Sequence, residues 1–210
     1  MKSENTTSRL PHNTEGSEVG IFRSRLLLSG IAAMLGALVA SASLAAQAPK
    51  PSEFQVKAAY IYNFGKFVRW PASSPANQNS SFAFCVLGDD PLSAVLQSTL
   101  TGQSLGGRPV SVKRIAKPQD ARDCRILSIG ATEESHLRVI LAALDQASVL
   151  TVSDIPDFSK RGGMIQFVLD GDRVRFEINR TNAEDAGLIL PSELLKVAMA
   201  VRGAGRPGGQ

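Results

Sequence analysis

The sequence has few of the residues that usually carry catalysis or bind metal ions. Its 210 residues include two cysteines and two histidines. Of the two histidines, His136 alone lies beyond the N-terminal 45 residues. A Ser-His-Asp triad would have to use His136, yet the GxSxG nucleophile motif is missing. Two cysteines without a second pair or a neighbouring histidine fall short of the roughly four ligands of a structural zinc. We therefore expect a protein that is not an enzyme and that uses no metal or other cofactor.

Nucleotide and nucleic-acid signatures are missing as well. The turn over residues 88–91, Gly-Asp-Asp-Pro, follows a predicted strand but has neither the GxGxxG nor the P-loop pattern, and its two carboxylates would repel a phosphate. The formal net charge is only +4, and no Lys/Arg block is interleaved with aromatic residues. These absences argue against a dinucleotide site and predict no nucleic-acid partner.

The N-terminal 45 residues have the pattern of a signal peptide. Arg23 and Arg25 precede an uncharged, mostly apolar run over residues 26–40, and small residues suited to cleavage follow as far as Ala45. A retained membrane anchor is the alternative, although a span needs about 18 or more apolar residues. No cysteine follows the apolar run, so lipid attachment is not predicted. We expect residues 1–45 to be cleaved and the mature chain to be exported.

Both cysteines that the chain contains, Cys85 and Cys124, lie in the exported part. An even number of cysteines in an oxidising compartment predicts one disulfide. Closing a loop of about 40 residues would stabilise the fold by about 4 kcal/mol in the chain-entropy model. Two buried free thiols are the alternative.

Helical and strand patterns alternate along the mature chain. Ser52 is a suitable N-cap for the first predicted helix, and Thr132 is the expected cap of the third. The predicted strands cover residues 82–87, 109–115, 125–129, 149–152, 164–169 and 173–178, and the predicted helices cover residues 53–69, 91–100, 133–146, 181–186 and 192–202. This order predicts an α/β fold, a single-domain layered sandwich with a mixed β-sheet flanked by helices. It spans residues 53–202, between a tether over 46–52 and a disordered tail over 203–210.

The stretch over residues 162–179 predicts the β-hairpin around which the fold is arranged. An apolar run leads into the turn Asp-Gly-Asp, and the following strand alternates polar with apolar side chains. One face of that strand is apolar (Val174, Phe176, Ile178) and the other is polar (Arg173, Arg175, Glu177, Asn179). The polar face is a candidate recognition surface, and an ordinary solvated strand face is the alternative.

Three stretches together resemble the YfiR-like family of exported periplasmic proteins. They are EFQVKAAYIYNFGKFVRWP at residues 53–71, FSKRGGMIQFVLDGDRVRFEIN at 158–179, and TNAEDAGLILPSELLKVA at 181–198. The resemblance implies an α/β domain that is often dimeric and has no known enzymatic activity. It further implies a periplasmic protein that represses an inner-membrane diguanylate cyclase through the cyclase's periplasmic region, which lowers cyclic-di-GMP signalling and biofilm formation. An outer-membrane lipoprotein antagonist that sequesters the repressor is implied too.

The resemblance also implies which residues bind the partner. Arg175, Glu177 and Asn179 match the segment that carries the regulatory contacts, and we add Arg161 from the preceding loop. In the alternative function, a periplasmic small-molecule sensor or carrier, Arg175, Glu177 and Arg161 line a polar pocket.

The resemblance extends to one of the family's disulfide pairs. Cys85 and Cys124 resemble that pair, whereas a second pair is missing here. Ser159 and Gln166 stand near the corresponding places.

Overall fold

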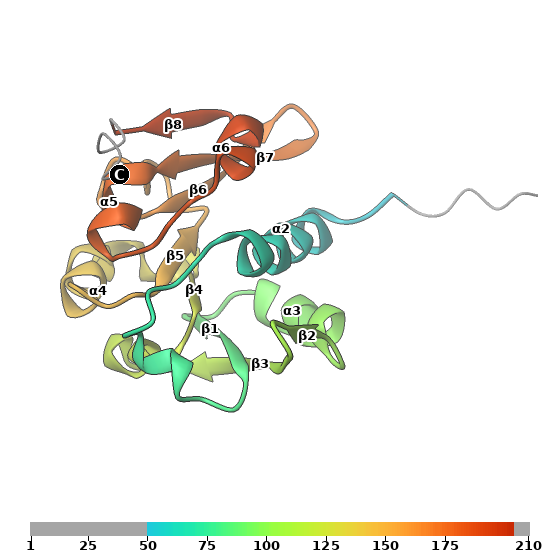
Figure 1. Cartoon of the computed structure of the whole chain (residues 1–210). Helices are drawn as coiled ribbons and strands as arrows, with labels where there is room; N and C mark the ends of the chain where they lie inside the picture. Colours follow the sequence, from blue (N-terminus) through green and yellow to red (C-terminus); the bar gives the residue numbers. More distant parts are fainter. Residues whose placement is uncertain (1–49, 204–210) are drawn as a thin grey trace, which may run out of the picture. The chain divides into compact units, whose positions relative to one another are not determined.

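The computed structural model describes residues 50–203 as an eight-stranded mixed β-sheet with helices on both faces (Figure 1). The predicted α/β fold with a mixed sheet is therefore confirmed. The predicted signal peptide, the first residues of the tether and nearly all of the predicted tail lie outside the described residues. Within the described range, none of the helices has the length and hydropathy that a membrane span requires.

Most elements lie where the sequence predicts them. The strands are β1 (Phe82–Leu87), β2 (Ser104–Leu105), β3 (Arg108–Ile115), β4 (Ile126–Ile129), β5 (Leu150–Ser153), β6 (Ile165–Asp170), β7 (Arg173–Asn179) and β8 (Ala200–Arg202). The α-helices are α2 (Glu53–Phe67), α3 (Leu92–Leu100), α4 (Leu137–Ala143), α5 (Arg180–Asp185) and α6 (Ser192–Val197). Short 3₁₀ helices occupy Pro75–Asn77, Pro118–Asp123 and Ala131–His136. Ser52 caps α2 as expected, because its side chain accepts a hydrogen bond from the Gln55 backbone.

The strand order across the sheet is β2-β3-β1-β4-β5-β6-β7-β8. Strands β3, β1, β4, β5 and β6 run parallel to one another, and β2 pairs antiparallel with β3 at one edge. The predicted hairpin is confirmed, since β6 and β7 pair antiparallel with Asp170 opposite Arg173 across a two-residue turn. Strand β8 pairs parallel to β7 and forms one edge of the sheet.

The apolar core lies in two clusters, one on each face of the sheet. Helices α2 and α3 cover one face, α4 lies on the other, and Figure 1 shows α2 and α4 on opposite sides of the strands. Strand β1 serves both clusters because successive side chains alternate, so that Phe84 faces the α2 side and Cys85 faces the α4 side. Cys85 and Cys124 form the predicted disulfide, with their Cα atoms 6.0 Å apart.

The prediction of a final helix over residues 192–202 is wrong at its end. Helix α6 ends at Val197, Ala198 is extended, and the chain continues into β8. The Met199 N–H donates to the Phe176 carbonyl oxygen at 2.8 Å. The unpaired backbone of β7 thus provides hydrogen-bond partners that outweigh the local helical pattern.

The helix predicted over residues 133–146 is also shorter than expected. The segment begins as a 3₁₀ helix at Ala131, with Gly130 as the capping residue, and becomes α-helical only from Leu137. Thr132 lies inside the 3₁₀ turn and does not cap it. Near the other end Gln146 has a positive φ of 56°, which a continuing helix does not allow.

A loop takes the place of a helix on the α4 side of β6 and β7. Phe158 from the loop over residues 154–163 is fully buried in the second apolar cluster. It packs so closely on Gly163 that a Cβ at that position would lie 2.1 Å from the Phe158 ring. The loop therefore seals this end of the core, and the polar face of β7 lies beside it.

Candidate functional site

Strand β7 presents the two faces that the sequence predicts. Val174, Phe176 and Ile178 are buried, whereas Arg175 and the other polar residues that alternate with them are more exposed. Phe176 packs edge-on against Phe64 of α2, with ring centroids 5.1 Å apart. The polar face consequently lies on the opposite side of the sheet from α2.

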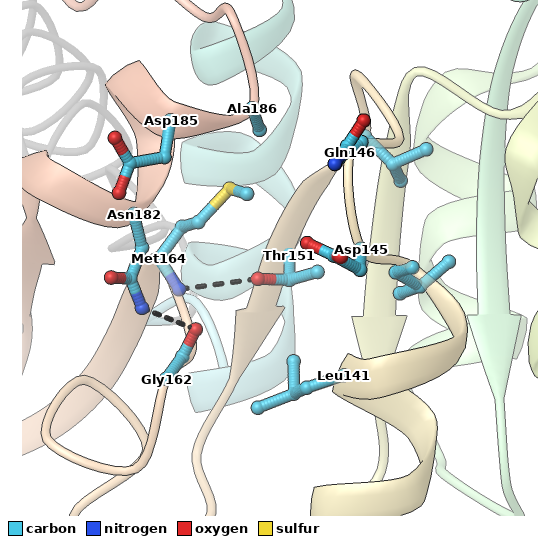
Figure 2. A pocket seen from close by; sticks show the side chains of 11 residues that line it. Leu141, Asp145, Gln146, Thr151, Gly162, Met164, Asn182, Asp185 and Ala186 are labelled. Carbon is cyan, nitrogen blue, oxygen red and sulfur yellow. Dashed lines mark hydrogen bonds between the residues drawn. The ribbon is translucent and has the colours of Figure 1, made fainter.

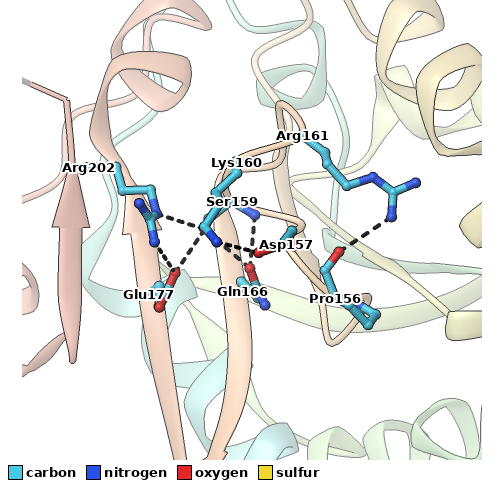
Figure 3. A network of polar contacts seen from close by, with 8 residues as sticks. All are labelled: Pro156, Asp157, Ser159, Lys160, Arg161, Gln166, Glu177 and Arg202. Atoms are coloured by element: carbon cyan, nitrogen blue, oxygen red, sulfur yellow. Dashed lines mark hydrogen bonds and ion pairs between the residues drawn. The ribbon is translucent and has the colours of Figure 1, made fainter.

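Ser159 is the centre of a polar network on this face (Figure 3). Its backbone N–H donates to Gln166 Oε1 at 3.1 Å, and its hydroxyl lies 2.9 Å from Glu177 Oε2 and 3.2 Å from Gln166 Oε1. Arg202 donates from Nε to the same hydroxyl at 3.2 Å and from Nη2 to Glu177 at 3.3 Å. Ser159 and Gln166 are thus joined by hydrogen bonds. We name Ser159, Gln166, Glu177 and Arg202 the Ser159 network.

The alternation along the strand predicts that Glu177 faces outward into solvent, but in the structure it does not. Its side chain is only 14% exposed, because Arg202 from β8 and Ser159 from the loop cover it. The alternation places Glu177 on the correct face of β7. The expectation of free exposure is wrong because that face is covered by segments distant in sequence.

Asn179 closes the network against α5. Its Nδ2 donates to the Ser159 carbonyl oxygen at 2.8 Å, and its Oδ1 accepts from the Asn182 backbone at 3.1 Å. This side chain therefore caps α5 and holds the loop at the same time.

Arg161 points away from the Ser159 network. Its Nη1 lies 2.8 Å from Glu134 Oε1 and also donates to the Pro156 carbonyl oxygen at 3.3 Å. Figure 3 shows Arg161 on the far side of the loop from Glu177. Arg161 and Glu177 therefore do not converge on one point.

Arg175 lines a different feature, a groove of about 650 Å³ between the start of α2 and the tip of the hairpin. The groove has an apolar floor that includes Tyr60 and the 60% exposed Leu169. Among the described residues, none forms a hydrogen bond or ion pair with Arg175. The pocket expected from Arg175, Glu177 and Arg161 together is not formed, because Arg161 pairs with Glu134, Glu177 pairs with Arg202, and only Arg175 lines the groove.

A smaller pocket of about 260 Å³ lies between α4, β5 and α5 (Figure 2). Two of its polar side chains form hydrogen bonds with backbone groups of the protein. Asn182 donates to the Gly162 carbonyl oxygen at 2.6 Å, and Thr151 accepts from the Met164 N–H at 3.1 Å. These groups fasten the loop and the start of β6, and none of the predicted partner-binding residues lines the pocket.

His136 lies on the surface at the junction between the 3₁₀ helix and α4. Its side chain is 69% exposed, and Nδ1 is 3.5 Å from the Glu133 carboxylate. Over residues 50–203, His, Cys, Asp and Glu side chains form no group of three that could hold a metal ion.

A buried ion cluster near the carboxyl ends of β1 and β5 was not predicted from the sequence. Lys57 of α2 is buried, with Nζ 2.7 Å from Asp154 and 2.5 Å from Glu53. Burial opposes the charge of Lys57, but the hydrogen bonds to the two carboxylates prevail and raise its pKa above the ordinary value. Burial raises the pKa of Asp90, against the opposing effect of the Leu92 N–H. A lysine within an amphipathic helix gives no sequence signal of such a role.

Comparison with solved structures supports the fold. A conserved domain protein from Vibrio cholerae O1 biovar El Tor superposes with a TM-score of 0.52 at 13% identity, covering 72% of this chain and 60% of that chain. The ABC domain in complex with L-Trp from Streptococcus pneumoniae gives a TM-score of 0.44 at 12% identity, covering 61% of this chain and 60% of that chain. At 13% identity, the similarity to the Vibrio cholerae protein shows a shared fold alone. The similarity to the second protein, with its lower TM-score, supports no conclusion. The chain thus spans about 60% of the length of either solved protein.

No curated protein matches the sequence. A known family does match, over residues 54–199. The matched range begins in α2, includes the Cys85–Cys124 disulfide and the β6–β7 hairpin, and ends just before β8. It confirms the resemblance seen in the sequence. The chain belongs to the YfiR/HmsC-like family.

Proposed function

We propose that this chain is a periplasmic regulatory protein that binds and represses an inner-membrane diguanylate cyclase through the cyclase's periplasmic region. Repression would lower cyclic-di-GMP signalling and biofilm formation. The observation that carries the proposal is membership of the YfiR/HmsC-like family over residues 54–199. The Cys85–Cys124 disulfide supports an oxidising compartment, because cytosolic thiols are kept reduced. We propose a role without catalysis, which the exposed position of His136 supports.

The proposed contact surface combines direct and supporting residues. Arg175 on β7 and Arg161 on the loop that carries Ser159 are both accessible to solvent and would contact the partner. Glu177 and Asn179 would act through the loop and Arg202, which they hold in place. Arg175 has no ion pair with any described residue, so an acidic group on the cyclase would be complementary to it.

Repression requires more than binding. A ligand shifts a two-state equilibrium only by its difference in affinity for the two states. The chain must therefore bind the inactive conformation of the cyclase's periplasmic region more tightly than the active one. An outer-membrane lipoprotein antagonist would relieve repression by competing for the free chain.

Gene deletion tests the regulatory role. We expect the cellular cyclic-di-GMP level and biofilm mass to rise on deletion and to return to normal with the wild-type gene. Complementation with the Arg175→Glu variant should fail, because the reversed charge lies on the proposed partner surface. The change should leave the fold intact, because Arg175 forms no hydrogen bond or ion pair with any described residue. Arg138→Glu, an exposed change on α4, is the matched control and should restore repression. An unchanged nucleotide level after deletion would remove the proposal.

A homodimer is a further part of the proposal. Strand β8 is a sheet edge, and exposed apolar side chains follow the chain towards and through it, Val197, Met199 and Val201. An unpaired edge with apolar side chains favours association with another chain. Sedimentation equilibrium should show a dimer that Val201→Lys dissociates, and a wild-type monomer at all concentrations would contradict this part.

A further inference from the structure

A pocket of about 410 Å³ lies at the amino-terminal ends of β1, β3 and β4, on the face that α2 covers. Its lining comes from the end of α2, the segment that follows, and the first residues of the strands. We propose that this pocket binds a small organic anion, a carboxylate with an apolar or aromatic body. The proposal is independent of the regulatory role and of the residues assigned to it.

Arg125 is the first reason. The residue is only 5% exposed, and its guanidinium lies 5.4 Å from the Trp70 ring centroid and 5.9 Å from that of Phe82. Nη2 donates to Asn77 Oδ1, and Asn77 is fixed because its Nδ2 donates to two backbone carbonyls. Within residues 50–203, Nε is buried without a hydrogen-bond acceptor and no carboxylate pairs with the group. A buried cation without a counter-charge is costly, and a bound anion would offset that cost.

Trp70 is the second, independent reason. Its indole Nε1–H is also buried and makes no hydrogen bond to any described residue. Buried indole N–H groups usually have a partner, since leaving one unpaired costs free energy. Trp70 comes from the segment after α2, whereas Arg125 precedes β4. Two residues from separate segments, each with an unpaired buried donor, therefore line the same pocket.

The charge of the lining agrees with an anionic ligand. Lys66, Arg108 and Arg125 line the pocket, and no Asp or Glu is among the residues that do. Burial and the neighbouring charge of Arg108 lower the pKa of Arg125, which indicates that the cations lack compensation. A pocket lined by charges of one sign attracts ligands of the opposite sign.

The apolar part of the lining sets the class of anion. Val68, Phe82 and Leu105 contribute hydrophobic surface beside the donors. Gly65 lets α2 approach closely, since a Cβ there would lie 2.8 Å from Leu105 Cδ1 and 3.3 Å from Phe82 Cε1. The volume falls within the roughly 300–1,000 Å³ of small-molecule pockets. A bare inorganic anion would leave this hydrophobic surface unused, whereas an aromatic carboxylate would use both parts.

Trp70 provides the assay, because it is the only tryptophan of the chain. Titration of the mature chain with benzoate should change the Trp70 fluorescence saturably, with a dissociation constant on the order of 1 mM for so small a probe. Benzamide, which has the same shape without the charge, and acetate, which lacks the ring, should each bind at least tenfold more weakly. Inorganic phosphate should not displace benzoate at equal concentration. Equal responses to benzoate and benzamide, or displacement by phosphate, would overturn the proposal.

Variants tie the response to the pocket. Arg125→Gln should weaken benzoate binding at least tenfold, and Arg108→Gln, at a more exposed position, should weaken it several-fold without disturbing the core. Arg138→Gln on α4 removes an equal charge far from the pocket and should leave binding unchanged. Circular dichroism checks that each variant folds. If the Arg125→Gln variant does not fold, the Arg108→Gln variant decides the outcome. Unchanged binding in Arg108→Gln would contradict the assignment.

Discussion

Glu177 is a residue whose role depends on what covers it. Its carboxylate accepts from Ser159 and pairs with Arg202 while its side chain remains largely covered. Glu177→Lys would remove the acceptor and place two cations together. We expect the free energy of unfolding to fall by about 2 kcal/mol, the cost of a lost hydrogen bond to a charged group. Urea denaturation followed by circular dichroism measures this.

Arg175 provides the matched comparison for Glu177 on the same strand face. It lies two residues away and has no hydrogen bond or ion pair with any described residue. Arg175→Gln should therefore change the free energy of unfolding by less than about 0.5 kcal/mol. Equal stability of the Glu177→Lys variant and wild type would show that the Ser159 network contributes nothing to the fold.

Asp90 yields a prediction about pH. Burial raises its pKa above the ordinary 3.8, so the ionised carboxylate disfavours the folded state. Stability linked to Asp90 is therefore complete below pH 3.8 and is lost as the pH rises through the folded-state pKa. Asp90→Asn keeps an oxygen for the Leu92 N–H, 2.8 Å away, and removes the charge. The variant should melt at a higher temperature than wild type at pH 7, and the difference should vanish below pH 3.8.

Asp89→Asn is the control for this measurement, because the Asp89 side chain is 90% exposed and pairs with Arg114 at the surface. Thermal unfolding of both variants across the pH range separates burial from general charge effects. A lower melting temperature for Asp90→Asn at pH 7 would mean that its attraction to Lys57 outweighs its burial.

At the scale of elements, β8 depends on one partner strand. The Met199 N–H begins the pairing with β7 at Phe176, and Met199 itself is 48% exposed. Met199→Pro removes this donor, and we expect a loss of about 1–3 kcal/mol. Met199→Ala keeps the donor and should be nearly neutral. Hydrogen exchange should show faster exchange in β7 and β8 for the proline variant alone, and equal protection in both variants would rule out this pairing.

The sequence predicted those elements whose causes are local. The hairpin over β6 and β7 follows from a turn and from alternation within 18 residues, and both are present in the structure. Strand β8 could not be predicted, because it forms by pairing Glu177 with Ala200 from a segment with helical periodicity. Separation along the sequence also explains why the contacts of Glu177 could not be predicted. The alternation placed Glu177 on the polar face, but only the fold brings Ser159 and Arg202 over it.

At the scale of the whole molecule, the two faces of the sheet separate two roles. The polar face of β7, with its loop and β8, is the surface proposed for the partner protein, next to the disulfide-bonded side of the core. The pocket at Arg125 and Trp70 is on the α2 side, at the opposite ends of the parallel strands from the Lys57 cluster. Ligand binding and partner binding can therefore be tested with separate variants.

The central claim is that this protein acts by binding a diguanylate cyclase. Isothermal titration of residues 46–210 against the periplasmic region of each membrane-anchored diguanylate cyclase of the same organism tests it directly. We predict that one of them binds with a dissociation constant on the order of 1 μM or tighter. Arg175→Glu should weaken that binding at least tenfold, and Arg138→Glu should not change it. Absence of binding to every cyclase, with the folded state of both proteins verified, would contradict the account.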